Sequence, residues 1–198
     1  MQIKKAVFIR SVKDKKNYFN NGMPEFALVG KSNVGKSSLI NMLTNNGKLA
    51  KVSKQPGKTK LINYFLLNDS FYMVDLPGYG YALASKQEQE GWEEMMHGYF
   101  EAAKENLRAV LLLVDIRHEP SVRDQGMIVY LEQMGIPYAV VATKADKIAK
   151  SKRKNECMKI RKNLPTSYSY NIIPVSSEDN YGKDELVAEI ERLITEER

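Results

Sequence analysis

The sequence predicts an α/β protein built on a mainly parallel sheet. Short apolar runs at 25–29, 109–114 and 138–142 are each followed by a helix-like segment, and such alternation is typical of parallel sheets. The run at 109–114 is apolar throughout, as expected for a strand buried on both faces. Right-handed crossovers would place the loops after these strands along one edge of the sheet, where such folds bind ligands.

The remaining elements follow from apolar periodicity and turn residues. Residues 1–23 are expected to form an extension, with a short strand at 6–9, packed on the edge of a single domain at 24–198. The expected strands of the domain are 25–29, 61–67, 71–74, 109–114, 138–142 and 172–175. The expected helices are 38–43, 120–134, 183–197 and one that the capping-box pair Ser85 and Glu88 begins and that includes Trp92 to Ala103, with a basic helical or loop segment at 148–164.

Composition is that of an ordinary globular chain. Its 198 residues suit one domain, and 43% are hydrophobic and 27% charged. No apolar run approaches the roughly 20 residues of a membrane helix, and the N-terminus lacks a secretory signal pattern. The single cysteine, Cys157, fits a cytoplasmic location. The net charge of +6 allows an anionic partner, and the absence of a coiled-coil pattern favours a monomer.

A glycine loop follows the first apolar run. Residues 30–38 have the spacing G-x-x-x-x-G-K-[ST] of a phosphate-binding loop. Glycines let the backbone direct several N–H groups at one point, and the helix that begins there adds its positive N-terminal end. Lys36 would reach the β- and γ-phosphates of a nucleotide, and the Ser37 hydroxyl would bind Mg²⁺. The alternative, a lysine-rich turn that matches by chance, is disfavoured by the flanking strand and helix.

A second glycine loop, Asp75-Leu76-Pro77-Gly78, follows the strand at 71–74. Asp75 would emerge at the same sheet edge as Ser37, where a carboxylate can hold Mg²⁺ through a water molecule. Gly78 could offer its backbone N–H to the γ-phosphate with no side chain in the way. An ordinary Asp-Pro-Gly turn is the alternative interpretation.

Guanine specificity is predicted by Thr143-Lys144-Ala145-Asp146, which ends the run at 138–142. An aspartate can accept from both N1–H and the 2-amino group of guanine, a donor pair that adenine lacks. Lys144 can lay its aliphatic stem over the base. The small residues of Ser176-Ser177-Glu178 could bring backbone N–H groups to the guanine O6. With the phosphate loop, these motifs indicate a GTP-binding protein.

The ordered motifs resemble the translation-factor-like GTPases of the Era, TrmE and EngA branch, and most closely the EngB family, also called YihA or YsxC. The resemblance covers Val7 to the C-terminus. It is carried by GKSNVGKSS at 30–38, QPGKT at 55–59, DLPGYGY at 75–81, DIRH at 115–118 and TKADK at 143–147. It implies a three-layer Ras-like P-loop GTPase domain with a mostly parallel six-stranded sheet and one antiparallel edge strand.

The same resemblance implies a cytoplasmic GTPase that acts as a switch in assembly of the large (50S) ribosomal subunit. Its partners would be GTP and GDP and the 50S subunit or its precursors, both rRNA and ribosomal proteins, without a membrane. Such proteins are needed for normal cell division and septation. The cofactor implied is Mg²⁺, with K⁺ as a further candidate.

The resemblance also assigns Thr59, whose hydroxyl would bind Mg²⁺ and whose backbone would contact the γ-phosphate until hydrolysis. Residues 45–60 would then form the first switch segment and 75–85 the second. The predicted metal ligands are Ser37, Thr59 and, through water, Asp75; the predicted catalytic residues are Lys36, Thr59 and Gly78. The predicted GTP-binding residues are Gly30, Lys31, Ser32, Asn33, Val34, Gly35, Lys36, Ser37, Ser38, Gly57, Lys58, Thr59, Lys60, Leu61, Asp75, Leu76, Pro77, Gly78, Thr143, Lys144, Ala145, Asp146, Val175, Ser176 and Ser177.

Tyr79 stands where Ras-like switches have a glutamine that orients the attacking water. A tyrosine cannot act as the same amide, so intrinsic hydrolysis is expected to be slow and to need a partner or a cation. Asn33 suggests K⁺, because an asparagine at this place in related K⁺-using GTPases helps to hold the ion. A loop-shaping role for Asn33 is the alternative.

Basic side chains crowd one stretch of the chain, and they suggest either a solvated face or a surface for ribosomal RNA. They are Lys144, Lys147, Lys150, Lys152, Arg153, Lys154, Lys159, Arg161 and Lys162. Two other functions compete with the GTP-driven switch. A small phosphotransferase would leave 143–146 unexplained, whereas a nucleotide-gated RNA-binding module would hydrolyse GTP only incidentally.

Overall fold

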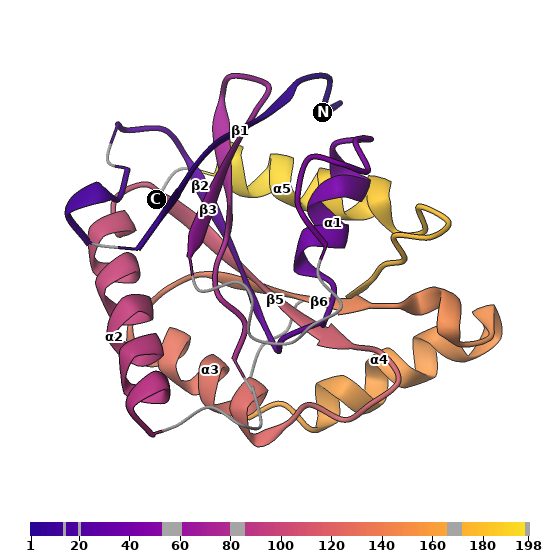
Figure 1. Cartoon of the computed structure of the whole chain (residues 1–198). Coiled ribbons are helices and arrows are strands. Elements are labelled where there is room, and N and C mark those ends of the chain that lie inside the picture. Colours follow the sequence, from indigo (N-terminus) through magenta and orange to yellow (C-terminus); the bar gives the residue numbers. More distant parts are fainter. Residues whose placement is uncertain (14, 20, 53–60, 80–85, 166–171, 197–198) are drawn as a thin grey trace.

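The chain folds around one mixed β-sheet with helices on both faces (Figure 1). The structure, a computed structural model, describes residues 1–13, 15–19, 21–52, 61–79, 86–165 and 172–196. Within these residues the sheet has seven strands in the order β1-β3-β4-β2-β5-β6-β7. The predicted α/β class with a mostly parallel sheet is therefore confirmed.

The elements agree with the expected order and differ from it mainly at their ends. The strands are β1 (Ala6–Val12), β2 (Glu25–Gly30), β3 (Ile62–Leu67), β4 (Phe71–Asp75), β5 (Leu107–Asp115), β6 (Tyr138–Thr143) and β7 (Ile173–Pro174). The α-helices are α1 (Lys36–Leu43), α2 (Lys86–Ala103), α3 (Val122–Gln133), α4 (Arg153–Lys162) and α5 (Lys183–Thr195). Short 3₁₀ turns are η1 (Lys15–Asn17), η2 (Ala145–Lys147) and η3 (Lys150–Lys152).

The strand count is corrected from six to seven, because β1 joins the sheet instead of only packing on its edge. β1 pairs with β3 from Ala6 opposite Leu67 to Val12 opposite Ile62, with a register shift between Phe8 and Arg10. The Asn68 side chain fixes the start of this pairing, since its Oδ1 accepts the N–H groups of Lys4 and Lys5. The sheet has one antiparallel strand, β3, as the resemblance implied, but β3 is not at the edge because β1 lies outside it. The division of the chain at residue 24 stays a prediction.

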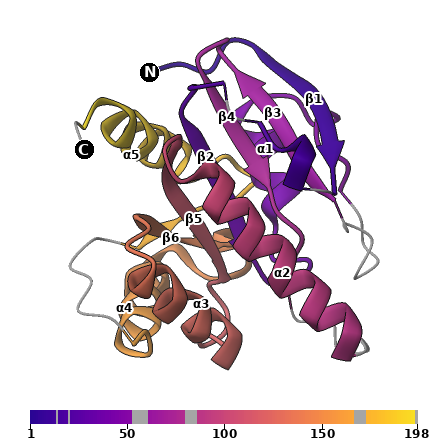
Figure 2. The same cartoon turned by 90° about the vertical axis from the view of Figure 1, so that its left-hand side faces the viewer.

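The two faces of the sheet carry separate hydrophobic clusters. One cluster lies between the sheet and α2, α3 and α4, and includes Tyr99, Ile128 and Ile160. The other lies under α1 and α5, and includes Leu39 and Ile190. Figure 2 shows α2 and α3 together on one side of the sheet. Among the described helices, none is long and apolar enough to cross a membrane.

This arrangement brings the predicted motifs to one edge of the sheet. β2, β4, β5 and β6 run parallel to one another, so their carboxyl ends meet at that edge. The glycine loop at 30–38, the loop after Asp75 and the segment at 143–146 all begin there. The fold therefore gathers segments that lie far apart in the sequence.

Candidate functional site

The glycine loop turns directly into α1, which begins at Lys36. Gly35 precedes the helix with a φ of 118°, a backbone conformation that L side chains rarely adopt. Among the described residues, no side chain caps this end of α1. The first N–H groups of a helix have no partner within it, so here they are left to an external acceptor. Together with the helix dipole, this geometry suits an anion such as phosphate.

Lys36 places a buried ammonium group beside this loop. The residue is 8% exposed, and its Nζ lies 3.5 Å from the Gly30 carbonyl oxygen. Burial lowers the pKa of Lys36, an effect that the nearby Asp75 partly opposes. A bound phosphate would add negative charge and favour the protonated form. Lys36 is therefore placed to act on an anion held by the loop.

Asp75 completes this part of the site with a carboxylate that is not fully paired. Its Oδ2 accepts a 3.0 Å hydrogen bond from the Ser37 hydroxyl. Its Oδ1 is buried and has no hydrogen-bond partner among the described residues. The pKa of Asp75 is raised, because the effect of burial exceeds the opposing effects of Lys36 and of the Ser37 hydrogen bond. An oxygen pair with spare acceptor capacity is the chemistry that a hard cation such as Mg²⁺ requires.

Gly78 fits closely against the phosphate loop. A Cβ added at this position would lie 2.9 Å from Lys36 Nζ and from the backbone N and Cα of Ser32. The next residue fastens the two loops together, because the Ser32 N–H donates to the Tyr79 carbonyl oxygen at 2.8 Å. Glycine is thus required here by close approach of two backbones.

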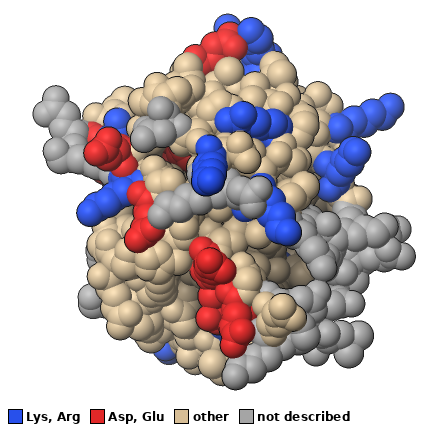
Figure 3. All heavy atoms as spheres, turned by 60° about the vertical axis from the view of Figure 1, so that its left-hand side comes forward, with Lys and Arg blue, Asp and Glu red and all other residues tan. Residues whose placement is uncertain are grey.

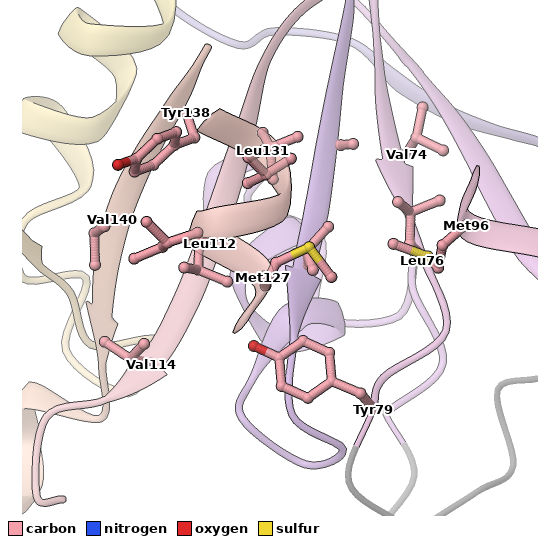
Figure 4. Packing of buried hydrophobic residues seen from close by; sticks show 14 of the residues in the cluster. Val74, Leu76, Tyr79, Met96, Leu112, Val114, Met127, Leu131, Tyr138 and Val140 are labelled. Atoms are coloured by element: carbon pink, nitrogen blue, oxygen red, sulfur yellow. The ribbon is translucent and has the colours of Figure 1, made fainter. Parts of the chain in front are cut away.

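The Tyr79 side chain points away from this site and into the core. Tyr79 is 5% exposed, and Figure 4 shows its ring extending toward Met127 and the rest of the cluster. Its hydroxyl donates to Asp124 Oδ1, and burial and that carboxylate raise the pKa of Tyr79, so the hydroxyl stays protonated. Trp92 packs edge-on against the ring and donates its Nε1–H to the Pro77 carbonyl oxygen at 2.8 Å. The expectation that Tyr79 cannot replace a water-orienting glutamine agrees with this position.

The segments predicted to contact guanine are hydrogen-bonded to each other and to the phosphate loop. The Thr143 hydroxyl lies 2.7 Å from the Val34 carbonyl oxygen. The Ala145 N–H donates to the Val175 carbonyl oxygen at 3.0 Å. Ser176 is fully buried, and its N–H donates to the Tyr181 carbonyl oxygen at 3.0 Å. Hydrogen bonds from the backbone and from the Thr143 hydroxyl therefore join the three loops into one framework.

Ion pairs position the charged groups of this segment. Lys144 has a φ of 61°, and its Nζ lies 3.0 Å from Asp115 Oδ2. Arg117 binds the same carboxylate through Nε and Nη2 at 2.9 and 2.7 Å. Burial raises the pKa of Asp115, but hydrogen bonds from Arg117 and Lys144 more than offset this and lower it. Asp115 thereby orients the lysine that was predicted to cover the base.

Asp146 is held as a carboxylate. Its Oδ2 lies 2.8 Å from Lys147 Nζ. Partial burial raises the pKa of Asp146, and hydrogen bonds with Lys147 and Ser176 outweigh that effect and lower it. A charged acceptor at this position is the form that would bind two donors of a guanine ring.

The structure brings most of the predicted residues together at this edge. Several are buried and could offer only backbone groups, namely Val34, Leu76, Pro77, Ala145 and Val175. Others are exposed, namely Lys31, Asn33, Leu61 and Ser177, whereas Gly30 is buried and Ser38 half-buried. The predicted GTP-binding residues Gly57, Lys58, Thr59 and Lys60 lie outside the described residues. Sequence reasoning missed Asp124 and the contact of Trp92, because only tertiary packing pairs them with the second glycine loop.

Comparison with known proteins agrees with this geometry. Residues 25–144 match the family described as 50S ribosome-binding GTPase. A probable GTP-binding protein EngB from Pelotomaculum thermopropionicum is 47% identical over 194 residues, which are 98% of this chain and 98% of the relative. The chain belongs to the EngB family of GTP-binding proteins.

Solved structures show the same fold. The crystal structure of another probable EngB has a TM-score of 0.67 at 24% identity, covering 87% of this chain and 99% of that one. The structure of NFeoB from S. thermophilus bound to GDP·AlF4⁻ and K⁺ has a TM-score of 0.57 at 20% identity. It covers 89% of this chain and 65% of that chain. These likenesses show a Ras-like fold, and the family match over residues 25–144 places the chain among the GTPases.

Proposed function

We propose that this EngB protein is a molecular switch that binds guanine nucleotides at the edge described above and hydrolyses GTP. The observation that carries the proposal is the framework joining Lys36, Gly78 and the loops at 143–146 and 175–177. Asp146 would accept N1–H and the 2-amino group of guanine, with Lys144 over the base. The N–H groups at the start of α1 and Lys36 would hold the phosphates.

Magnesium fits the same proposal. Ser37 and Asp75 supply the hydroxyl and the partly unpaired carboxylate, and Thr59 is the third proposed ligand. The chemistry that a bound Mg²⁺ would supply here is positive charge, which would offset the charge developing on the transferred group. The chain's own contribution is to hold the phosphates, with Gly78 offering its N–H and Lys36 its ammonium.

Hydrolysis without a partner is proposed to be slow. The Tyr79 side chain is buried away from the loops, so it does not orient a water at the phosphates. A positive charge from K⁺ or a group from the ribosomal particle would complete the site. Asn33, exposed in the phosphate loop with a φ of 62°, is the proposed K⁺ residue, and NFeoB provides a structural relative that holds K⁺. Equal hydrolysis rates in K⁺ and Na⁺ buffers would contradict the K⁺ role.

Assembly of the 50S subunit in the cytoplasm, with a further requirement in cell division and septation, is the proposed cellular role. The family description names 50S binding. Helix α4 and the turn η3 directly before it carry the exposed lysines Lys150, Lys152, Lys154 and Lys162. Charge is unevenly distributed, since α2 carries the exposed acids Glu90, Glu93, Glu94 and Glu101. Figure 3 shows a face on which a band of acidic side chains runs below several basic ones, with further acids among those basic groups. We therefore place the RNA contact at α4 and not at α2.

Nucleotide titration tests the switch directly. The protein should bind GTP and GDP and not ATP. Asp146→Asn should bind GTP much more weakly and xanthosine triphosphate more tightly than the wild type does, because the asparagine N–H can donate to the 2-oxo group of xanthine. Preference for ATP in the wild type would end the GTPase proposal and favour a phosphotransferase.

Binding to precursor 50S particles tests the cellular role. Hydrolysis should rise when the particles are added, and binding should weaken steeply with salt. Replacing Lys152 and Lys154 by glutamine should make the plot of log binding constant against log salt concentration less steep, by about one unit of slope per lost phosphate contact. Binding that is insensitive to both salt and nucleotide would contradict the role as an assembly switch.

A further inference from the structure

Arg153 differs from the basic residues that surround it in the sequence. It is the first residue of α4 and is only 4% exposed, whereas Lys152 and Lys154 on either side are exposed. A guanidinium group is rarely buried unless its hydrogen bonds and its charge are satisfied. Its position therefore points to a role inside the protein and not on the proposed RNA surface.

Two contacts join Arg153 to both loops of the proposed guanine site. Its Nε donates a 2.9 Å hydrogen bond to the carbonyl oxygen of Ala145, the residue before Asp146. Its guanidinium carbon lies 4.0 Å from the centre of the Tyr181 ring, a cation–π distance. Tyr181 in turn accepts the N–H of Ser176 through its carbonyl oxygen. One side chain thus bridges the segment at 143–146 and the segment at 175–181.

Arginine has the shape for this bridge. Its planar group can stack on an aromatic face and donate from its edge at the same time, which a lysine ammonium cannot do. The Nη1 atom is buried and has no hydrogen-bond partner in the described part of the chain. An unpartnered buried donor lowers stability, so the side chain is not simply an optimised core contact.

We propose that Arg153 is a positioning residue for guanine recognition. It fixes the position of Asp146 relative to the Ser176 loop, so that Asp146 can accept a hydrogen bond from the 2-amino group of the base. The inference rests on the proposed guanine-nucleotide binding. It predicts that Arg153 sets selectivity among purines, and does not touch the nucleotide itself.

The test compares GDP with inosine diphosphate, which lacks only the 2-amino group. Dissociation constants are measured for both ligands with the wild type, Arg153→Lys and Arg153→Met. Arg153→Met should lower the affinity for GDP about tenfold. The affinity for inosine diphosphate should fall less, so the ratio of GDP affinity to inosine diphosphate affinity should decrease. Compared with Arg153→Met, Arg153→Lys should regain part of the GDP affinity because it keeps the positive charge. It should regain little of the preference for GDP over inosine diphosphate, because lysine cannot stack and donate at the same time.

Two further variants keep the result interpretable. Tyr181→Leu removes the stacked ring from the other loop at a residue that is 39% exposed, and it should also reduce the GDP preference. Arg123→Met makes the same change at an exposed arginine in the first turn of α3, and it should leave the preference unchanged. Should Arg153→Met fail to fold, Tyr181→Leu and Arg153→Lys carry the test.

The outcomes separate this inference from the proposed function. A lower melting temperature with an unchanged ratio of GDP to inosine diphosphate affinity would overturn the positioning role while leaving GTP binding intact. A wild type that binds ADP as tightly as GDP would overturn the proposed function itself, and this inference with it. A reduced ratio in Arg153→Met and Tyr181→Leu, with Arg123→Met unaffected, would support the inference.

Discussion

The Tyr79 hydroxyl donates a hydrogen bond of 2.5 Å to Asp124 Oδ1, which ties the second glycine loop to the first turn of α3. Asp124 is 6% exposed, and its Oδ2 accepts the N–H and the hydroxyl of Ser121, the N-cap of α3. One carboxylate therefore serves both as part of a capping box and as the acceptor for Tyr79. Any movement of the loop that withdraws Tyr79 also leaves a buried oxygen of α3 unpaired.

Tyr79→Phe should lower stability without changing the chemistry. The substitution leaves Asp124 Oδ1 without its donor, at a cost of about 1–3 kcal/mol in the free energy of unfolding. The intrinsic rate of GTP hydrolysis should stay close to that of the wild type, since the hydroxyl faces the core. Denaturant unfolding and single-turnover hydrolysis measure the two effects.

Tyr130→Phe is the matched control for this substitution. The Tyr130 hydroxyl is buried and has no hydrogen-bond partner among the described residues, so its removal should not destabilise the protein. A Tyr79→Phe protein that is as stable as the wild type but hydrolyses GTP more slowly would contradict this prediction, because it would mean that the hydroxyl acts at the nucleotide and not on Asp124.

Gly78→Ala should impair GTP hydrolysis much more than GDP binding. The new methyl would lie 2.9 Å from backbone atoms of Ser32, so one of the two loops must shift. A displacement of the proposed γ-phosphate contact should slow hydrolysis roughly a hundredfold. GDP lacks that phosphate and should bind with nearly its normal affinity.

Gly91→Ala provides the comparison for a glycine without close neighbours. A Cβ at Gly91 in α2 would meet nothing within 4 Å, so alanine there should stabilise the helix by up to about 1 kcal/mol and leave activity unchanged. Equal losses of GTP and GDP affinity in Gly78→Ala would mean that the damage is not confined to the γ-phosphate contact.

Trp92 should report on the nucleotide state by fluorescence. It is the single tryptophan of the chain, and its indole N–H donates to the Pro77 carbonyl oxygen between Asp75 and Gly78. Exchange of GDP for a non-hydrolysable GTP analogue should draw Gly78 toward the γ-phosphate and change the emission of Trp92. Free N-acetyltryptophanamide with the same nucleotides controls for absorbance. Superimposable spectra in the two states would argue against movement of this loop.

Local sequence patterns were enough to predict the fold class and to expect the candidate site motifs at one edge of the sheet. The phosphate loop and the motifs at 75–78 and 143–146 are short, contiguous and tied to strand ends, so their placement follows from topology alone. The sequence predicts a strand at 6–9 but not its place in the sheet, because the partner strand β3 is far away in the chain, with Ala6 opposite Leu67.

Burial of polar side chains was the part that the sequence could not reveal. Arg153 lies in a run of basic residues and Tyr79 in a glycine-rich loop, and neither context predicts a side chain less than 6% exposed. Both are buried by partners from other elements, the ring of Tyr181 and the carboxylate of Asp124. Whether such residues turn inward is decided by tertiary packing and not by local propensity.

Glu25 is a buried carboxyl at the opposite end of β2 from the phosphate loop. Its Oε2 accepts a 2.8 Å hydrogen bond from the Tyr99 hydroxyl, while its Oε1 has no partner among the described residues. Burial raises the pKa of Glu25 from 4.5 to about 7, and the hydrogen bond from Tyr99 only partly opposes this. The folded protein therefore keeps a proton on Glu25 that the unfolded chain has already released above pH 4.5.

Stability should consequently fall as the pH rises from about 4.5 to about 7 and should then level off with respect to this group. The loss attributable to Glu25 is on the order of 3 kcal/mol, since each pKa unit corresponds to about 1.4 kcal/mol. Glu25→Gln keeps the acceptor for Tyr99 but cannot ionise, so its free energy of unfolding should depend less on pH in this window. Glu119→Gln, at an exposed acid, should retain the wild-type slope. Identical pH profiles for Glu25→Gln and the wild type would show that Glu25 does not titrate between folded and unfolded states in this range.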